Sequence, residues 1–381
     1  MTRTIVDINI LQSVPPSNLN RDDTGSPKTA VYGGTRRARV SSQAWKRATR
    51  LAFDDLLDKD LLGTRTKRVV ELIGERIVVQ DASIDIGRAQ ELATLALSAA
   101  GIKVSAPRKS SAENPLPDEA GYLLFLSSRQ LDHVASLCVS AHAADDAKAA
   151  LKGSEIKKAL DTAHSVDLAL FGRMVAEATD LNVDAACQVA HAISVHPVAT
   201  EFDFYTAVDD HKAADDAEDA GAGMIGTVEF NASTLFRYAT IDVDALQKNL
   251  GDAEATRRAV EAFVRAFTTS MPTGKQNTFA NRTLPDAIVI AVRDSQSVNP
   301  VGAFEEAIVG DGRLAQASTR LADHLSDIDA QFGTTPVASW VVRVGSATAP
   351  LDAVMGAERV SLDAAVSGVG ETVASRVVAS S

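Results

Sequence analysis

The sequence predicts an α+β fold in which one β-sheet is interrupted by a long helical insertion. Apolar runs rich in β-branched residues occur at the amino terminus and again in the second half of the chain. Helical patterns fill the middle. Strands so far apart along the chain must pair across this middle segment. We therefore expect a sheet domain with a helical insertion at about residues 60–200.

The expected elements follow from the positions of turn-forming and helix-capping residues and from the periodicity of apolar residues. The first strand should cover residues 4–13, and Pro15-Pro16 should begin a long loop that runs to Val40. Ser41 and Ser42 can cap a helix that ends near Leu57. Further helices are expected at 67–75, 87–101, 119–137, 141–195, 252–270 and 312–332, and further strands at 226–243, 286–292 and 337–344. Of two acidic low-complexity segments, 143–150 and 209–223, the second has the composition of a mobile loop tip.

Composition excludes several classes of protein. The chain has 381 residues, 45% of them hydrophobic, which is enough to bury a substantial core. It shows neither a charged-then-apolar leader nor an apolar stretch long enough to span a membrane, so we expect a soluble, cytoplasmic protein without membrane partners. Cys138 and Cys187 each lie in an apolar helical pattern, which predicts two buried thiols, no metal site and no cofactor.

Charge is distributed unevenly along the chain. The net charge of −12 argues against nucleic-acid binding. Residues 1–50, however, contain nine Lys or Arg against three acids, a net charge of +6, so the remaining chain carries −18. A basic strip on an acidic body suits a protein that holds a polyanion at one groove and repels it elsewhere. A solvated charged patch is the alternative that charge alone leaves open.

The expected helix after Ser41 has one cationic face. Positions i, i+3, i+4 and i+7 of this helix share that face, and they are Gln43, Lys46, Arg47 and Arg50. Like charges so close together destabilise a helix unless an anionic partner neutralises them. The N–H groups and the serine hydroxyls at the helix start suit phosphate oxygens. An ordinary solvated helix face would have the same pattern.

The loop before this helix is rich in amides, cations and glycine, as expected of a segment that follows a nucleic-acid backbone. Together, segments 19–23, Lys28, 33–43 and 46–50 closely resemble the start of the crRNA-binding backbone subunit of the type I-E CRISPR Cascade complex, the CasC family. Further matches occur in order at Gly172-Arg173-Met174, 190–193, 204–210, 236–239 and 274–280. The resemblance spans roughly residues 4–310 and fades in the tail after about Leu351.

The resemblance implies a hand-like α+β fold. Its palm is a modified RRM (ferredoxin-like) sheet, with helical fingers inserted into it and a thumb loop that reaches the next copy. On this basis residues 1–59 are expected to hold the first palm strand with the RNA-binding loop and helix. Residues 60–195 are the fingers insertion, residues 196–225 the thumb loop, and residues 226–381 the remaining palm strands and helices.

The resemblance also implies function. Copies stack head to tail along the CRISPR guide RNA, hold its backbone and leave its bases free to pair with invading target DNA in antiviral defence. Other Cascade subunits and, indirectly, the effector helicase-nuclease are the remaining partners implied. The chain itself is expected to be a non-catalytic subunit.

Site residues are carried over position by position. The resemblance implies guide-RNA contacts at Arg21, Lys28, Ser41, Gln43, Lys46, Arg47 and Arg50. Met174 and Tyr205 match positions that wedge beside a displaced nucleotide, and Arg173 lies nearby for phosphate. Phe204 stands where the family often has another aromatic residue, a change that packing or stacking on RNA tolerates. Without the family, Met174 would be assigned to a helix core and Phe204 with Tyr205 to a β-hairpin.

Two further groups are less specific. Lys275, Gln276 and Asn277 match a guide-proximal loop, although a plain surface turn has the same composition. Lys152, Lys157 and Lys158 lie near positions where the family carries lysines that attract target DNA, and ordinary helix salt bridges explain them equally well.

An enzyme is the competing interpretation. Relatives in other CRISPR effector types cut RNA with a loop aspartate, so Asp22 or Asp23 could serve a metal-dependent RNA nuclease. Metal-assisted cleavage needs partner acids, and an aspartate beside Arg21 can instead hold the arginine fork. No nucleotide-binding or hydrolase motif occurs. His191 and His196, five residues apart, fit packing or capping. A scaffold without RNA is disfavoured by the cationic helix face.

Overall fold

The computed structural model describes residues 3–111, 116–174, 181–207 and 224–380. It has a mixed α+β fold, as predicted. The chain divides into two compact units. The sheet unit comprises residues 1–52, 189–240 and 263–373, and the helical unit comprises residues 53–188, 241–262 and 374–381. No helix among the described residues is both long and apolar enough to cross a membrane.

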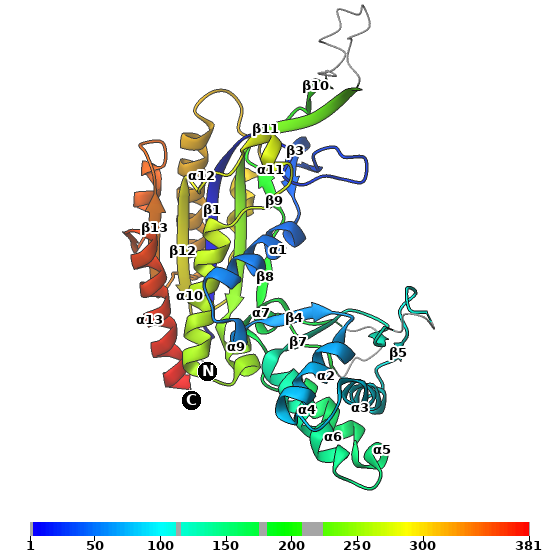
Figure 1. The fold of residues 1–381 in the computed structure, drawn as a ribbon. Helices are drawn as coiled ribbons and strands as arrows, with labels where there is room; N and C mark the ends of the chain where they lie inside the picture. Colours follow the sequence, from blue (N-terminus) through cyan, green and yellow to red (C-terminus); the bar gives the residue numbers. More distant parts are fainter. Residues whose placement is uncertain (1–2, 112–115, 175–180, 208–223, 381) are drawn as a thin grey trace, which may run out of the picture. The chain divides into compact units, whose positions relative to one another are not determined.

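One large sheet organises the sheet unit, with the strand order β14-β13-β12-β1-β11-β9-β3-β2 (Figure 1). The strand bounds are β1 Ile5–Ser17, β2 Thr29–Tyr32, β3 Thr35–Val40, β9 Ala192–Ser194, β11 Met224–Asp242, β12 Ala287–Arg293, β13 Ala338–Arg343 and β14 Ala357–Arg359. β1 pairs antiparallel with β12, from Ile5 opposite Arg293 to Leu11 opposite Ala287. β14 is parallel to β13. Strand β10 (Glu201–Ala207) pairs with β11 beyond this path.

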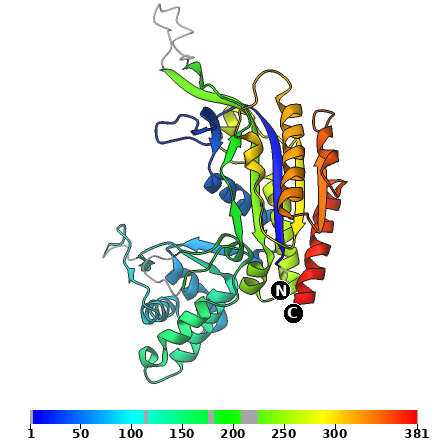
Figure 2. The same ribbon diagram turned by 180° about the vertical axis from the view of Figure 1, so that it is seen from behind.

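Helices cover both faces of the sheet. Successive strand residues point to opposite faces, so neighbouring residues of one strand pack against different helices. Phe236 of β11 packs in a core cluster with Leu321 and Leu325 of helix α12 (Arg313–Phe332), which Figure 2 shows in front of the strands. Its neighbour Arg237 meets the other layer, formed by α1 (Ser42–Ala52) and α10 (Ala253–Thr269). The unit also contains the short helix α11 (Gln276–Phe279), most of the long helix α13 (Leu362–Ser380), and 3-10 turns at Pro300–Phe304 and Ala349–Ala353.

The helical unit has its own apolar core, built mainly from α2 (Val69–Gln80), α3 (Ile86–Ala99) and α4 (Ser128–His142). Its other helices are α5 (Ala147–Ala150), α6 (Gly153–Leu160), α7 (Val166–Phe171) and α9 (Val243–Leu250), with 3-10 turns at Phe53–Asp55 and Lys59–Leu61. Its strands are β4 (Gly63–Thr66), β5 (Val104–Ser105), β6 (Glu119–Ala120), β7 (Leu124–Ser127) and β8 (Cys187–Val189). Cys138 and Cys187 are both buried, as predicted, and burial raises the pKa of Cys138 to about 12.

Two predictions for the amino-terminal segment were wrong. β1 continues through Pro15-Pro16 to Ser17, because pairing with β12 ends at Leu11 and the prolines remove no ladder hydrogen bond to that strand. The expected long loop contains the β2–β3 hairpin. Tyr32 pairs with Thr35, so Gly33-Gly34 is a two-residue turn, and both glycines have positive φ, which suits a type I′ turn.

The middle and the tail also differ from expectation. The segments predicted as helices at 119–137 and 141–195 begin or end with short strands, because apolar runs of this length fit either state until tertiary partners decide. In the acidic segment 143–150, residues 147–150 form α5. The segment 209–223 lies outside the described residues. In the tail after about Leu351, where the resemblance fades, the structure contains α13, and its Gly368 lies directly against Trp340 of β13.

Candidate nucleic-acid interface

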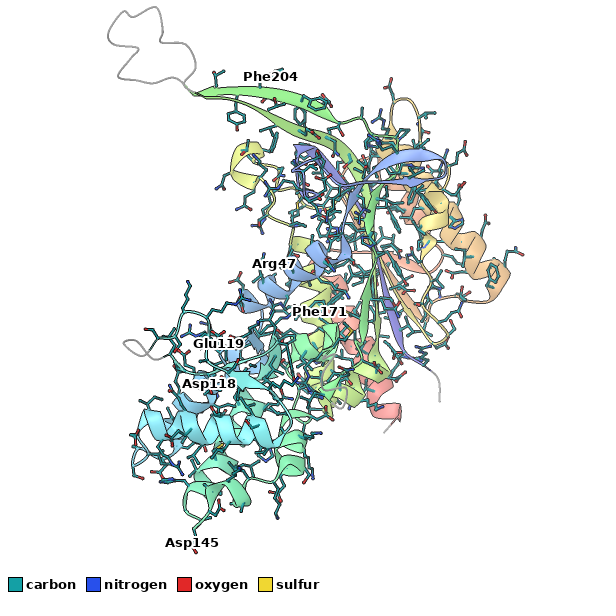
Figure 3. All side chains as sticks on the ribbon, turned by 90° about the vertical axis from the view of Figure 1, so that its right-hand side faces the viewer. Arg47, Asp118, Glu119, Asp145, Phe171 and Phe204 are labelled. Atoms are coloured by element: carbon teal, nitrogen blue, oxygen red, sulfur yellow. The ribbon has the colours of Figure 1, made fainter. Side chains whose placement is uncertain are left out.

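Helix α1 presents the cationic face that the sequence predicted. Trp45 and Thr49 are buried, whereas Gln43 and Arg47 are exposed and Lys46 is partly exposed. Lys46 and Arg47 make no ion pair with any residue that the structure describes. In Figure 3 Arg47 stands on the same side of the sheet toward which the ribbon carrying Phe204 extends. This face therefore has positive charge available to an anionic partner.

Side chains from distant segments fix the start of α1. Ser41 is buried, and its Oγ accepts a hydrogen bond from the Ala44 N–H at 3.3 Å, so this residue caps the helix. Asn20 Oδ1 accepts from the Ser41 N–H at 2.9 Å, and the Asn20 carbonyl accepts from the Lys28 N–H at 2.9 Å. The loop that carries Arg21 and Lys28 is therefore held beside the helix start.

His191 also lies at this helix start; the sequence allowed a capping role for it but did not predict which helix it caps. Its Nδ1 accepts from the Ser42 N–H at 3.2 Å and faces the Arg39 guanidinium at 3.3 Å. Both partners are donors only, so Nδ1 is unprotonated and the ring hydrogen is on Nε2. Burial and the positive charges of Arg39 and Lys28 lower the pKa of His191. Only the pairing of β9 with β3 brings His191 here, and no local pattern signals that pairing.

Asp22 shapes the tip of the loop. Its Oδ1 accepts from the Thr24 N–H at 2.9 Å, the Thr24 hydroxyl at 2.7 Å and the Ser26 N–H at 3.0 Å. The hydrogen bond from the Thr24 hydroxyl is the largest cause of the lowered pKa of Asp22. This geometry is an Asx turn, so Asp22 orders its own loop instead of holding the fork of Arg21.

The segment with Lys275 packs against the same loop. A Cβ on Gly274 would lie 2.2 Å from the Leu19 carbonyl oxygen, so only glycine permits this approach. Residues 19–25 and Gly274 line one open cavity of about 540 Å³. Gln276 and Asn277 are exposed on the short helix α11, and Lys275, partly exposed, precedes it with φ +50°. The expected loop is thus a single helical turn beside Arg21.

Strands β10 and β11 form a two-stranded ribbon. Tyr205 lies opposite Gly226, and a Cβ on that glycine would lie 2.2 Å from the tyrosine ring, so the ring fills the space above the glycine. Phe204 is on the opposite face and is 73% exposed. The two aromatic residues therefore cannot act as one wedge. On the Tyr205 face, Phe230 contacts Phe279 of α11, with ring centroids 5.8 Å apart.

Arg173 does not occupy the position expected of a phosphate ligand. It is 5% exposed, and its guanidinium donates to the carbonyls of Phe125, Leu160 and Leu181 at 2.6–3.1 Å. The phosphate role predicted for Arg173 is therefore not supported, because its donors are committed inside the helical unit. Met174, the next residue, is 89% exposed and remains open to a partner.

The lysines of the helical unit have the mixed environment that the sequence left open. Lys152 forms an exposed ion pair with Glu155 at 3.4 Å, a helix salt bridge of the ordinary kind. Lys158 is exposed, and Lys157 is partly exposed and interacts with another group.

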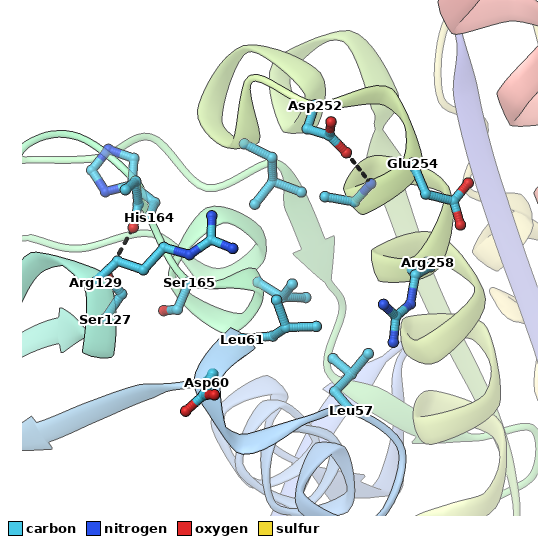
Figure 4. Close-up of a pocket in the computed structure, with 14 residues that line it drawn as sticks. Leu57, Asp60, Leu61, Ser127, Arg129, His164, Ser165, Asp252, Glu254 and Arg258 are labelled. Carbon is cyan, nitrogen blue, oxygen red and sulfur yellow. Dashed lines mark hydrogen bonds between the residues drawn. The ribbon is translucent and has the colours of Figure 1, made fainter.

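A separate cavity of about 350 Å³ lies within the helical unit (Figure 4). Its lining mixes cations and acids, and Arg258 pairs with Asp58 at 3.5 Å. Asp252 caps α10 through the Ala255 N–H at 2.6 Å. Glu254 pairs with Arg257, so some of the charges at this cavity have partners within the helical unit. Across the described ranges, no cluster of three or more His, Cys, Asp or Glu side chains could hold a metal ion.

Comparison with known proteins shows which family this chain belongs to. The family model described as CT1975-like protein matches residues 6–368. The chain belongs to the CT1975-like family. A search of the curated proteins finds no match.

Solved structures similar to this CT1975-like chain include two described as CRISPR RNA-guided surveillance complexes. A chain of the first, described as pre-nicking, is 34% identical, with a TM-score of 0.81 over 96% of this chain and 100% of that chain. A chain of the second is 30% identical, with a TM-score of 0.72 over 97% of this chain and 99% of that chain. The CT1975-like chain is therefore similar over nearly its whole length to subunits of such complexes.

Proposed function

We propose that this CT1975-like chain is the crRNA-binding backbone subunit, CasC, of a type I-E Cascade complex. One observation supports this most directly: the cationic face of α1 carries Lys46 and Arg47 without acidic partners in the described part of the chain. The neighbouring segments add Arg21, Lys28 and Lys275. The similarity to chains of RNA-guided surveillance complexes supports a guide RNA as the polyanion that would neutralise these cations.

In the proposed mode, the protein holds phosphate and ribose while the bases remain exposed. Contacts to a backbone carry no sequence information, which suits a subunit that must accept any guide. Gln43, Gln276 and Asn277 contribute amide donors, and Ser41 acts through the capped helix start. The sheet unit corresponds to the RRM-like palm, residues 60–188 of the expected 60–195 to the fingers, and the β10–β11 ribbon to the described part of the thumb.

The same proposal covers assembly. Copies stack head to tail along the guide, and Met174 and Tyr205 wedge beside displaced nucleotides, where stacking on any base needs no sequence match. Target DNA pairs with the exposed guide bases, with Lys152, Lys157 and Lys158 attracting it to the helical unit. Other Cascade subunits bind the assembled filament, and the effector helicase-nuclease acts through them.

We further propose that the subunit is non-catalytic. A nuclease aspartate must offer carboxylate oxygens to a metal ion. In Asp22 one of the two oxygens already accepts three hydrogen bonds from its own loop. A nuclease assay compares the assembled wild-type complex with a complex that carries Asp22→Ala and Asp23→Ala. We expect neither complex to cleave RNA. Cleavage by the wild type that the substitutions abolish would refute the proposal.

The binding proposal is tested by Lys46→Ala combined with Arg47→Ala. We expect weaker RNA binding for every sequence tested, with a salt slope smaller by about 1.4 for two lost contacts to a single strand. Fluorescence anisotropy with labelled RNA over a range of salt concentrations measures both. The matched control is Lys248→Ala with Arg359→Ala, which removes the same charge at two exposed positions outside this interface. Equal losses in both variants, or a loss confined to some sequences, would overturn the proposal.

A further inference from the structure

Arg237 of β11 is a buried cation directly beneath α1. It is 1% exposed, and its guanidinium lies over the Trp45 ring of α1, 3.7 Å from the ring centroid. The Phe267 ring of α10 lies 4.6 Å from the same group. The guanidinium is thus packed between aromatic rings of two helices, on the side of α1 opposite its cationic face.

The hydrogen bonds of Arg237 go to neutral groups. NH1 donates to Oε1 of Gln12 in β1 at 2.5 Å, and NH2 donates to the Phe267 carbonyl. Nε has no hydrogen-bond partner among the residues that the structure describes. Desolvation alone lowers the pKa of Arg237 to about 9. A buried charge without a carboxylate destabilises a fold, so a structural need for packing alone would favour an apolar side chain at this position.

Gln12 extends this network to the second candidate RNA-binding segment. Its Nε2 donates to the Thr283 carbonyl at 2.8 Å, to Thr283 Oγ1 at 3.2 Å and to Met271 Sδ at 3.2 Å. Thr283 Oγ1 in turn donates to the Ser13 carbonyl at 2.9 Å. Met271 and Thr283 flank the segment that carries Lys275 and α11. A continuous buried chain therefore connects Trp45 under α1 with both ends of that segment.

We propose that Arg237 is a positioning residue that fixes α1 relative to the Lys275 segment, so that the cations of both follow one phosphate strand. This inference rests on the proposed RNA-binding function. Arg237 touches no RNA itself in this proposal. Its planar guanidinium stacks on Trp45 and at the same time donates in fixed directions to Gln12 and Phe267. This combination explains why arginine, and neither lysine nor an apolar residue, suits the site.

Two substitutions separate positioning from charge. Arg237→Lys keeps a cation but loses the planar stack and the two-directional hydrogen bonding. Arg237→Met keeps much of the volume and removes the buried charge, so its thermal stability should stay near or above that of the wild type. We expect both variants of the full chain to bind labelled single-stranded RNA about tenfold or more weakly. We also expect faster hydrogen exchange of the α1 amides in both.

Thr283→Val is a milder third variant. It retains shape and removes only the hydroxyl that links Gln12 to Ser13. We expect this variant to fold, to exchange faster within residues 275–279 and to bind RNA several-fold more weakly. It keeps the test decisive if a substitution at Arg237 prevents folding.

Arg293→Lys provides the matched control. Arg293 is equally buried in the sheet unit but pairs with Asp7 at 3.0 Å and Asp329 at 2.6 Å. This control should lose stability, while its folded protein binds RNA normally. Wild-type affinity in Arg237→Lys, or wild-type affinity in Thr283→Val, would overturn the positioning role. The proposed RNA-binding function fails separately, if Lys46→Ala with Arg47→Ala leaves RNA affinity unchanged in the same assay.

Discussion

At the scale of single residues, Arg173 and Met174 show how differently adjacent residues can be used. Gly172 has φ +76°, and a Cβ there would lie 2.8 Å from the Val183 carbonyl oxygen, so the chain turns sharply before Arg173. The arginine then enters the helical unit and satisfies three carbonyls, while Met174 is left at the surface. Arg173 thus holds the backbone from which Met174 projects.

We predict that Arg173→Ala destabilises the chain and that Met174→Ala does not. Losing Arg173 removes three buried hydrogen bonds to carbonyl groups, of which the Leu160 carbonyl keeps another donor, Gln130 Nε2. This loss should lower the free energy of unfolding by about 3 kcal/mol. Met174 buries little area, so its removal should change stability by less than about 0.5 kcal/mol. Urea unfolding followed by circular dichroism measures both. Similar losses for the two variants would contradict the assigned roles.

The buried histidine His196 predicts a pH dependence of stability. Its Nε2 accepts from the Thr234 N–H at 3.1 Å, and burial, together with Arg313 and Arg37, lowers its pKa below the ordinary value of 6.5. The unfolded chain therefore takes up this proton first as pH falls. The stabilisation is complete above about pH 6.5 and is lost between that pH and the lower folded pKa.

Measuring the free energy of unfolding at about pH 7.5 and pH 5.5 tests the contribution of His196. Few carboxylates titrate between these pH values, so they change the result little. His196→Gln can still accept from Thr234 and has no proton to gain. We expect it to reduce the loss of stability on acidification. An unchanged pH dependence in this variant would rule out His196 as a contributor.

At the scale of elements, glycines decide where aromatic and basic side chains point. Gly33-Gly34 turns the basic segment into a hairpin, and Gly274 admits the Lys275 segment beside Leu19. In the β10–β11 ribbon, Gly226 leaves the space that the Tyr205 ring occupies. At Gly274 and Gly226 an added Cβ would displace a neighbouring candidate RNA-binding segment or side chain. At Gly33 and Gly34 a residue that cannot adopt a positive φ would disturb the hairpin turn.

We predict that Gly226→Val displaces the Tyr205 ring and impairs assembly on RNA as strongly as Tyr205→Ala does. The new side chain would occupy the ring's position, and each lost base stack is worth about 1–3 kcal/mol. Thr227→Val is the control, because Thr227 pairs with Phe204 on the other face. Native mass spectrometry of complexes on one RNA length compares the variants. Normal assembly of Gly226→Val would count against a wedge role for Tyr205.

At the scale of the whole molecule, charge separation favours one binding mode. An amino-terminal segment of +6 on a chain of −12 attracts a polyanion locally, and the remaining acidic surface discourages binding elsewhere. We expect the number of bound copies to increase in steps with RNA length, as an open head-to-tail interface requires. Mass photometry on RNAs of increasing length gives the copy number. A constant copy number would exclude stacking along the strand.

The sequence by itself determined the elements whose signal is local. The cationic and apolar faces of α1, the strands β12 and β13 and the helices α10 and α12 all follow from periodicity within one segment. The resemblance to a known family added the candidate RNA-binding positions, of which the structure places Arg21, Lys28 and Gln43 around the start of α1.

Only the tertiary structure decided which groups meet across long sequence separations. It turned Arg173 inward, brought His191 to the start of α1, placed Gly274 against Leu19 and set Arg237 between Trp45 and Phe267. The physical reason is that the burial and pairing of a polar side chain depend on partners tens or hundreds of residues away. Local periodicity carries no information about those partners.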